Sequence, residues 1–203
     1  FTTPEFNVNV CQLPFWSIVI YYSWRIFNQN KINVKDCIIL GFFGAIGFLS
    51  KYLFLYLLSS IVLLFLYFIF YKKIKKFDFK YLILIEVFVV LLVPHLIWLN
   101  DNDYITITYG FKRTGLETSN FLDHLKFPII FLLKQLILLV PFFVLVRLLI
   151  KKVKLKINFK DKKLFFLFFV NIVPIMLILM TSIITGSKIR TMWMTPFYLS
   201  FGV

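Results

Sequence analysis

Four clusters of polar residues stand at the edges of long apolar runs, and two of them carry cations suited to a phosphate group. Lys51 follows Ser50 in the short polar break between two apolar runs. Lys188 and Arg190 stand two residues apart, shortly before Trp193. Lysine binds phosphate as a point charge and arginine binds it through paired N–H groups, so all three are candidates for gripping a phosphate or pyrophosphate. The simpler alternatives are a lysine that reaches into the lipid headgroups and an ordinary basic loop.

The other two clusters carry carboxylates and a histidine. Glu5 lies just before the first apolar run, where an acidic residue also stabilises a helix start without any further role. His95 lies about one turn before the end of a later run, and Asp101 and Asp103 follow that run. Carboxylate oxygens suit a divalent cation, and a histidine suits a metal ion or a hydrogen-bonded acceptor. A solvated loop beside a structural histidine would give the same pattern.

The apolar runs that carry these clusters are long enough to cross a membrane. Hydrophobic residues make up 61% of the chain and the mean hydropathy is +0.88, while a span needs about 20 apolar residues. These values exclude soluble folds and predict an all-α polytopic membrane protein, a bundle of about six to seven transmembrane helices. The expected spans are Leu13–Phe27, Ile38–Leu49, Tyr52–Tyr71, Tyr81–Leu99, Phe127–Ile150 and Leu164–Thr185, with another beginning at Pro196.

Lysine and arginine fall mainly on alternate gaps between these runs, which predicts a topology. The gaps Asn28–Lys35, Lys72–Lys80 and Lys151–Lys163, with the adjoining helix ends, hold most of the 23 basic residues. The positive-inside rule places these gaps in the cytoplasm, and the clusters described above on the outer side. The net charge of +14 is thereby explained by topology and by anionic lipid, and calls for no nucleic acid partner.

The same rule resolves the stretch from Asp36 to Tyr71. A single helix of that length would run about 54 Å, far beyond the hydrocarbon core, and would separate two lysine-rich gaps. A tight hairpin turning at Ser50–Lys51 keeps both gaps on one side. Its first arm carries Gly41, Gly44 and Gly47, a spacing of small residues that suits close contact between helices.

The ends of the chain indicate a piece of a larger protein. It begins at Phe1 without an initiator methionine and stops just after a run has begun. We therefore expect residues 1–203 to be part of one transmembrane domain that continues at both ends. In the expected topology Cys11 and Cys37 lie on opposite sides of the membrane, so they cannot form a disulfide with each other.

The order of these clusters resembles that of the polyprenyl-phosphate-sugar glycosyltransferases of the GT-C class. It is most similar to the bacterial glycosyltransferase family 39 group, which is related to protein O-mannosyltransferases. The segments that carry the resemblance are TTPEFNVNVCQLPFW, GFFGAIGFLSKYLFLYLL, VPHLIWLNDNDYITITYGFKR and GSKIRTMWMTPFYLSFG. They resemble the family's T-P-D-x-P-L-x-x-F-W, G-x-x-x-G-L-x-x-L-S/T-K, P-H-L-x-W-L-x-x-x-D-F-x-T-x-x-Y and K-x-R-x-x-W-x-x-P-x-Y patterns. Glu5 stands where the family has aspartate, and Asn7 where it has proline.

This resemblance implies transfer of a sugar from a polyprenyl-phosphate donor to a glycan, lipid or protein acceptor at the outer, periplasmic face of the bacterial inner membrane. It implies an inverting reaction, a catalytic carboxylate upstream of Phe1 and commonly a divalent metal cation. Glu5 is then a secondary catalytic candidate, and Lys51, Lys188 and Arg190 bind the donor phosphate. His95, Asp101 and Asp103 are candidates for the acceptor or the metal.

Two other functions fit a polytopic chain. A secondary transporter or lipid flippase places charged groups or broken helices near the membrane midplane, often in two repeated halves. Here the midplane is mainly Phe, Leu, Ile and Val, and no internal repeat is visible. A noncatalytic scaffold in envelope assembly would have no need of the outer cations. The sequence favours the glycosyltransferase, with the transporter as the alternative.

Overall fold

The computed structural model describes residues 7–29, 31–73, 77–116, 120–150 and 161–202, and within these it contains helices and no strand. A short α1 (Val8–Cys11) leads into α2 (Leu13–Asn28) and α3 (Val34–Ser50). A 3-10 turn η1 (Tyr52–Phe54), α4 (Leu55–Leu66) and the π-helical turn η2 (Tyr67–Tyr71) form one further rod. Then follow α5 (Lys80–Asp101), α6 (Ile105–Thr114), α7 (Asp123–Ile150), α8 (Lys162–Thr185) and the 3-10 helix η4 (Thr191–Tyr198). The all-helical prediction is confirmed.

Four of these rods are long and apolar enough to cross a membrane: Tyr52–Tyr71, Lys80–Asp101, Asp123–Leu149 and Lys162–Thr185. Each coincides closely with an expected span. The first two expected spans correspond to α2 and α3, which are shorter than the four long rods. They have 16 and 17 residues, or lengths of about 24 and 26 Å at 1.5 Å per residue. The stretch expected to begin a further span at Pro196 forms the end of η4, which starts five residues earlier at Thr191.

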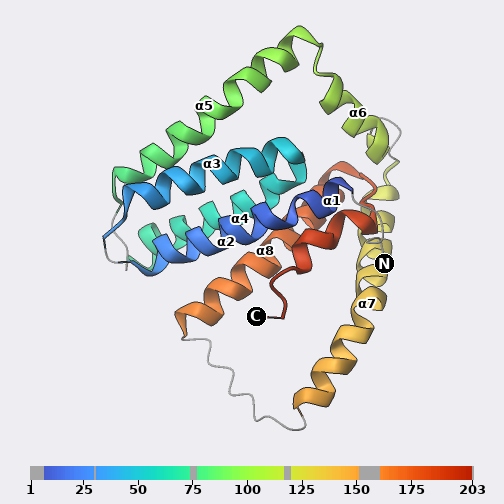
Figure 1. Cartoon of the computed structure of the whole chain (residues 1–203). Coiled ribbons are helices and arrows are strands. Elements are labelled where there is room, and N and C mark those ends of the chain that lie inside the picture. The colour runs from blue at the N-terminus through green and yellow to red at the C-terminus, as the bar shows by residue number, and fades with distance from the viewer. Residues whose placement is uncertain (1–6, 30, 74–76, 117–119, 151–160, 203) are drawn as a thin grey trace.

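The predicted hairpin turn at Ser50–Lys51 is present. The Ser50 hydroxyl donates a hydrogen bond to the Gly47 carbonyl, and Lys51 adopts an extended backbone that ends α3. A side chain on Gly47 would collide with the Phe54 ring, whose atoms lie 2.5–2.7 Å from an added Cβ. The glycine therefore lets the start of the next rod fold back onto α3, and α4 runs back beneath it (Figure 1).

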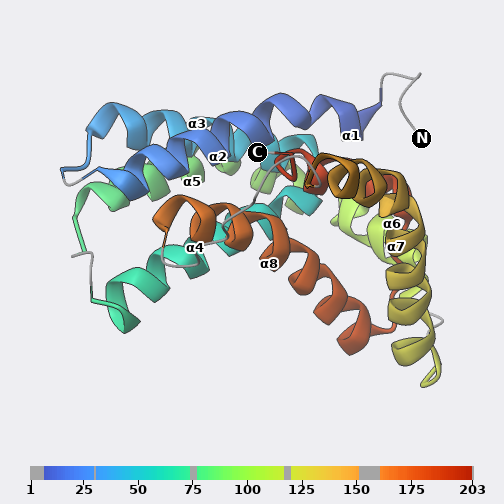
Figure 2. The same ribbon diagram turned by 90° about the horizontal axis from the view of Figure 1, so that it is seen from below.

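The α3–α5 pair forms the most extensive helix contact in the described part of the chain, and the two helices lie side by side in both views (Figures 1 and 2). A Cβ on Gly41 would lie 2.5 Å from the backbone carbonyl oxygen of Leu84. The backbones thus touch at this point, as the small-residue spacing predicts. Gly44 is less constrained, because a Cβ there would meet Leu58 and Phe88 at ordinary contact distances.

The bundle has two polar ends, named here for one residue of each. The Lys51 end holds the turn at Ser50–Lys51 and the contacts of its side chains, and the Asp36 end holds the ends of α2 and α3 that face each other around Asp36. Aromatic side chains fill the bundle between them. Trp16 packs on Phe54 and Phe197 nearer the Lys51 end, and Phe27 packs on Phe68 and Phe166 nearer the Asp36 end.

Candidate functional site

Lys51 is the centre of the Lys51 end. Its ammonium Nζ donates a hydrogen bond to Asn9 Oδ1 over 2.5 Å, and it lies 5.1 Å from the centroid of the Trp193 ring. Asn9 comes from α1 and Trp193 from η4, so the lysine ties three segments that are far apart in the sequence. A cation over an indole face is favourable, and more so when water is excluded.

The electrostatic position of Lys51 is unusual for a surface lysine. Burial, followed by repulsion from Arg113, lowers the pKa of the Lys51 ammonium to about 8. Among the residues that the structure describes, the one ion pair is Arg25–Asp36 at the other end of the bundle. The charge of Lys51 is therefore met by a neutral amide and an aromatic ring, with no described carboxylate in contact. Because no described carboxylate neutralises this positive charge, an anionic ligand that binds beside Lys51 would stabilise its charged form.

Arg113 adds a second positive charge to this end. It lies in the last turn of α6, where its guanidinium also donates to the Tyr109 hydroxyl over 3.1 Å. Sequence reasoning counted this arginine only toward the topology and did not assign it to the phosphate cluster. The signal was the run Phe-Lys-Arg after the Tyr-Gly pair, but nothing in the sequence indicates that α6 folds back toward Lys51.

Lys188 and Arg190, the other two predicted phosphate-binding residues, lie on a segment that contacts the end of α6 and leads into η4. The backbone N–H of Lys188 donates to the carbonyl of Thr114, next to Arg113, over 2.9 Å. Arg190 directly precedes η4, three residues before the ring on which Lys51 rests. Both side chains are exposed. The structure thus brings their backbone segment to α6, which carries Arg113, and to η4, which carries Trp193, while the described cationic groups do not contact one another.

A hydrogen-bonded triad lies directly beside Lys51. The Tyr52 hydroxyl is 2.7 Å from His95 Nε2 and 2.8 Å from Thr106 Oγ1, and His95 stacks on Trp98. The triad joins the start of η1, the far part of α5 and the start of α6. It joins η1 and α5 to α6, the helix that also carries Arg113. The sequence singled out His95 but not its two partners.

The predicted acidic candidates lie apart from this arrangement or outside it. Asp101 ends α5 and Asp103 follows with a positive φ of 48°, and both are exposed. Glu5 lies outside the described residues. Within the described ranges no three side chains of His, Cys, Asp or Glu gather closely enough to hold a metal ion, and His95 Nε2 already contacts Tyr52. Metal binding by His95, Asp101 and Asp103 remains a prediction from the sequence.

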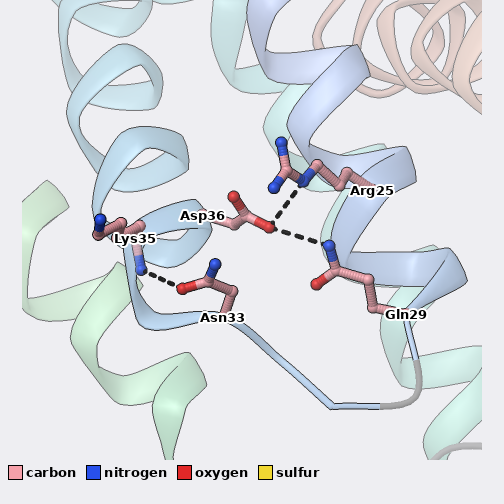
Figure 3. Close-up of polar contacts among 5 residues, drawn as sticks. All are labelled: Arg25, Gln29, Asn33, Lys35 and Asp36. Atoms are coloured by element: carbon pink, nitrogen blue, oxygen red, sulfur yellow. Dashed lines mark hydrogen bonds and ion pairs between the residues drawn. The ribbon is translucent and has the colours of Figure 1, made fainter.

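The Asp36 end shows what a fully paired charge looks like in this bundle. Asp36 is 1% exposed, and its Oδ2 lies 3.0 Å from Arg25 Nε and accepts a hydrogen bond from Gln29 over 3.1 Å (Figure 3). Nearby, the Lys80 ammonium donates to the carbonyl of Ile32 over 2.9 Å. This network was not predicted. Its signal was an arginine near the end of one apolar run and an aspartate at the start of the next.

Residues 1–98 match the family model for dolichyl-phosphate-mannose-protein mannosyltransferases. This match confirms the resemblance to GT-C-type glycosyltransferases. It takes in Asn9, Lys51, Tyr52 and His95, and it ends before Arg113 and the segment of Lys188 and Arg190. A search of curated proteins and a search of solved structures each found no match. With the apolar helices, the family match supports an integral membrane glycosyltransferase of the GT-C type.

Proposed function

We propose that this chain is part of a glycosyltransferase that takes a sugar from a polyprenyl-phosphate donor and passes it to an acceptor at the periplasmic face of the bacterial inner membrane. The observation that carries the proposal is Lys51, a half-buried cation that no described carboxylate neutralises, in the part of the chain that matches the family. The donor has a phosphate at the membrane surface and a lipid tail inside it. Lys51 stands where apolar helices meet that surface in the predicted topology.

The reaction develops negative charge on the departing phosphate. An acceptor oxygen attacks the anomeric carbon, the bond from that carbon to the phosphate oxygen breaks, and the polyprenyl phosphate leaves with the electron pair. Lys51 and Arg113 supply fixed positive charge for the leaving group, and such fixed charge accounts for a large part of many rate enhancements. We assign Lys188 and Arg190 to the same phosphate, because the backbone of Lys188 bonds to Thr114 next to Arg113. The proton of the acceptor needs a carboxylate base, which we expect upstream of Phe1, with Glu5 as a secondary candidate.

The test is release of free polyprenyl phosphate by the purified full-length protein, including the segment expected upstream of Phe1, in proteoliposomes, from a panel of radiolabelled polyprenyl-phosphate sugars, with and without a divalent metal. We expect Lys51→Ala to lower release about 100-fold, the loss typical of removing one charge-stabilising donor. Lys162→Ala is the matched control, because Lys162 is an exposed lysine on α8 outside this cluster.

Two results would contradict the proposal. One is equal release by the Lys51 and Lys162 variants at equal expression. The other is absence of release from every donor by a folded protein, which would favour the alternative of a transporter or flippase and make substrate flux the next measurement.

A further inference from the structure

An apolar cavity extends along the rod Tyr52–Tyr71, from near the Lys51 end to the Asp36 end. A cavity of about 720 Å³ opens between α2, α3, α4 and α5. Figure 2 shows α3 and α4 diverging toward the end at which α5 begins, and residues from that end line the cavity. One face of the α4–η2 rod forms its longest wall, from Leu55 to Phe70. Phe77, Tyr81 and Phe88 close it from the side of α5.

The walls of this cavity suit a hydrocarbon chain. Apart from Ser23, Ser59 and the Tyr81 hydroxyl, the side chains that line it are aliphatic or aromatic. From Leu55 to Phe70 the wall extends about 22 Å at 1.5 Å per residue. One leaflet of the hydrocarbon core is about 15 Å deep, half of the full thickness. The cavity can therefore take the whole length of a chain from one leaflet.

Exposed lysines directly follow the residues that line the cavity at the Asp36 end. Lys72 and Lys73 follow η2 directly, two and three residues beyond Phe70, and both are exposed. Lys80 precedes the cavity residue Tyr81, although its ammonium is bound to the Ile32 carbonyl. Asp78 is the one described carboxylate in this short stretch, and it caps the start of α5 by accepting from the N–H of Lys80. Lys72 and Lys73 are thus two exposed cations near the apolar opening, and the Lys72 ammonium lies 6.0 Å from the centroid of the Tyr67 ring.

We infer that this cavity binds an anionic phospholipid, with an acyl chain between α3, α4 and α5 and the phosphate at Lys72 and Lys73. Basic pockets between membrane helices are a known way of holding acidic lipid headgroups. The charge of these lysines selects an acidic headgroup over a neutral one. The phosphate position proposed here is distinct from that of the proposed donor, because Lys51 and Lys72 lie at opposite ends of the rod that begins at Tyr52 and ends at Tyr71.

Native mass spectrometry of the purified protein tests this inference, with phosphatidylglycerol and phosphatidylcholine offered at equal concentration. We expect one phosphatidylglycerol to be retained in preference. Val62→Trp places an indole in the cavity and should abolish retention, whereas Val90→Trp should leave it unchanged. Val62 lines the cavity and is 55% exposed, while Val90 lies on α5 outside the cavity and is 60% exposed, so the pair is matched. Neutralising Lys72 and Lys73 with glutamine should weaken the preference about fivefold for each lysine.

Three results would overturn the inference: no retained lipid, equal effects of Val62→Trp and Val90→Trp, or displacement of phosphatidylglycerol by an equal concentration of polyprenyl phosphate. The last would assign the cavity to the tail of the proposed donor. If Val62→Trp fails to fold, Ser59→Leu replaces it, since Ser59 also lines the cavity and is partly exposed.

Discussion

The two polar ends of the bundle treat a buried charge in opposite ways. At the Asp36 end, a carboxylate that is 1% exposed is paired with Arg25 and bonded to Gln29. At the Lys51 end, a cation rests on an amide and an indole ring beside a second cation, Arg113. The first arrangement satisfies its own charge and joins two helices. The second leaves positive charge unbalanced among the described residues, which is the condition for binding an anion rather than for holding a fold.

The largest effect is expected from removing Arg25, which tests whether the paired charge at the Asp36 end stabilises the fold. Arg25→Ala leaves the Asp36 carboxylate buried without its counter-charge, and breaking a buried pair costs about 3–5 kcal/mol of stability. We expect about 3 kcal/mol here, because the Arg25 side chain is 41% exposed and water replaces part of the interaction. Thermal unfolding in detergent measures the loss. Lys51→Ala is the contrasting variant: it removes the hydrogen bond to Asn9 and the contact with Trp193 but leaves no buried charge unpaired, so its loss of stability should be well below that of Arg25→Ala.

Removing Arg113 should give a smaller effect, on the reaction rather than on stability. Arg113→Gln withdraws one of the two charges from the leaving phosphate and should lower the release of polyprenyl phosphate about tenfold, equivalent to about 1.4 kcal/mol. Lys126→Gln serves as a control on an exposed lysine of α7. Equal release by both variants would remove Arg113 from the site.

The pH dependence of donor binding tests whether the Lys51 ammonium binds the phosphate. The Lys51 ammonium is charged below its pKa of about 8 and neutral above it. Affinity for a phosphate-bearing donor should therefore be full below pH 8 and fall as the pH rises through that value. Lys51→Arg should hold its affinity to higher pH, because a guanidinium stays protonated. A wild-type profile that is flat from pH 7 to 10, measured as binding of a polyprenyl-phosphate sugar, would count against Lys51.

The stability of the ligand-free protein should move the other way over that window. Between about pH 8 and the ordinary lysine pKa of 10.5, the unfolded chain carries the Lys51 proton and the folded protein does not. Stability rises with pH wherever the unfolded state binds more protons, so the Lys51 contribution rises across this range. Lys51→Ala, compared with the wild type by denaturant unfolding at pH 8 and 10, isolates that contribution.

The smallest expected effect concerns Tyr52. Tyr52→Phe removes the hydroxyl that joins His95 to Thr106 and should cost about 1 kcal/mol of stability, the usual net value of a hydrogen bond. We also expect a loss of donor release well below that of Arg113→Gln, since α6 loses one anchor but keeps its charges. Limited proteolysis within 105–114 would show a loosened α6. An unchanged cleavage rate would mean that other contacts hold this helix.

The sequence predicted the parts of the fold that depend on local hydrophobicity and charge. The rods Tyr52–Tyr71 and Lys80–Asp101 follow from runs of apolar residues, and the turn at Ser50–Lys51 follows from the lysines on either side. The contacts of Lys51 do not follow in the same way. Asn9 lies 42 residues before it and Trp193 lies far beyond it, and their meeting depends on how α1 and η4 pack.

The Asp36 network was missed for a similar reason. A charged residue at the edge of an apolar run reads as solvent-facing, because apolar pattern alone does not tell which face of a short helix meets its neighbour. The placement of Asp36 toward Arg25 is set by the packing of α2 on α3. Arg113 belongs to the same class, since its position depends on the left-handed turn at Asp103–Tyr104 and on the contact of Thr106 with Tyr52, neither of which is evident from the apolar pattern.

The backbone contact at Gly41 also limits how the molecule can move. With the Leu84 carbonyl against α3, a sliding of α5 along α3 would drive side chains of one helix into the backbone of the other. We therefore expect α3, α5 and the Ser50–Lys51 turn at the end of α3 to move together as one rigid unit. Asn9 of α1 and Trp193 of η4, which contact the Lys51 ammonium, lie outside this helix pair, so uncovering the lysine would require movement of those two segments rather than a slide of α5 along α3.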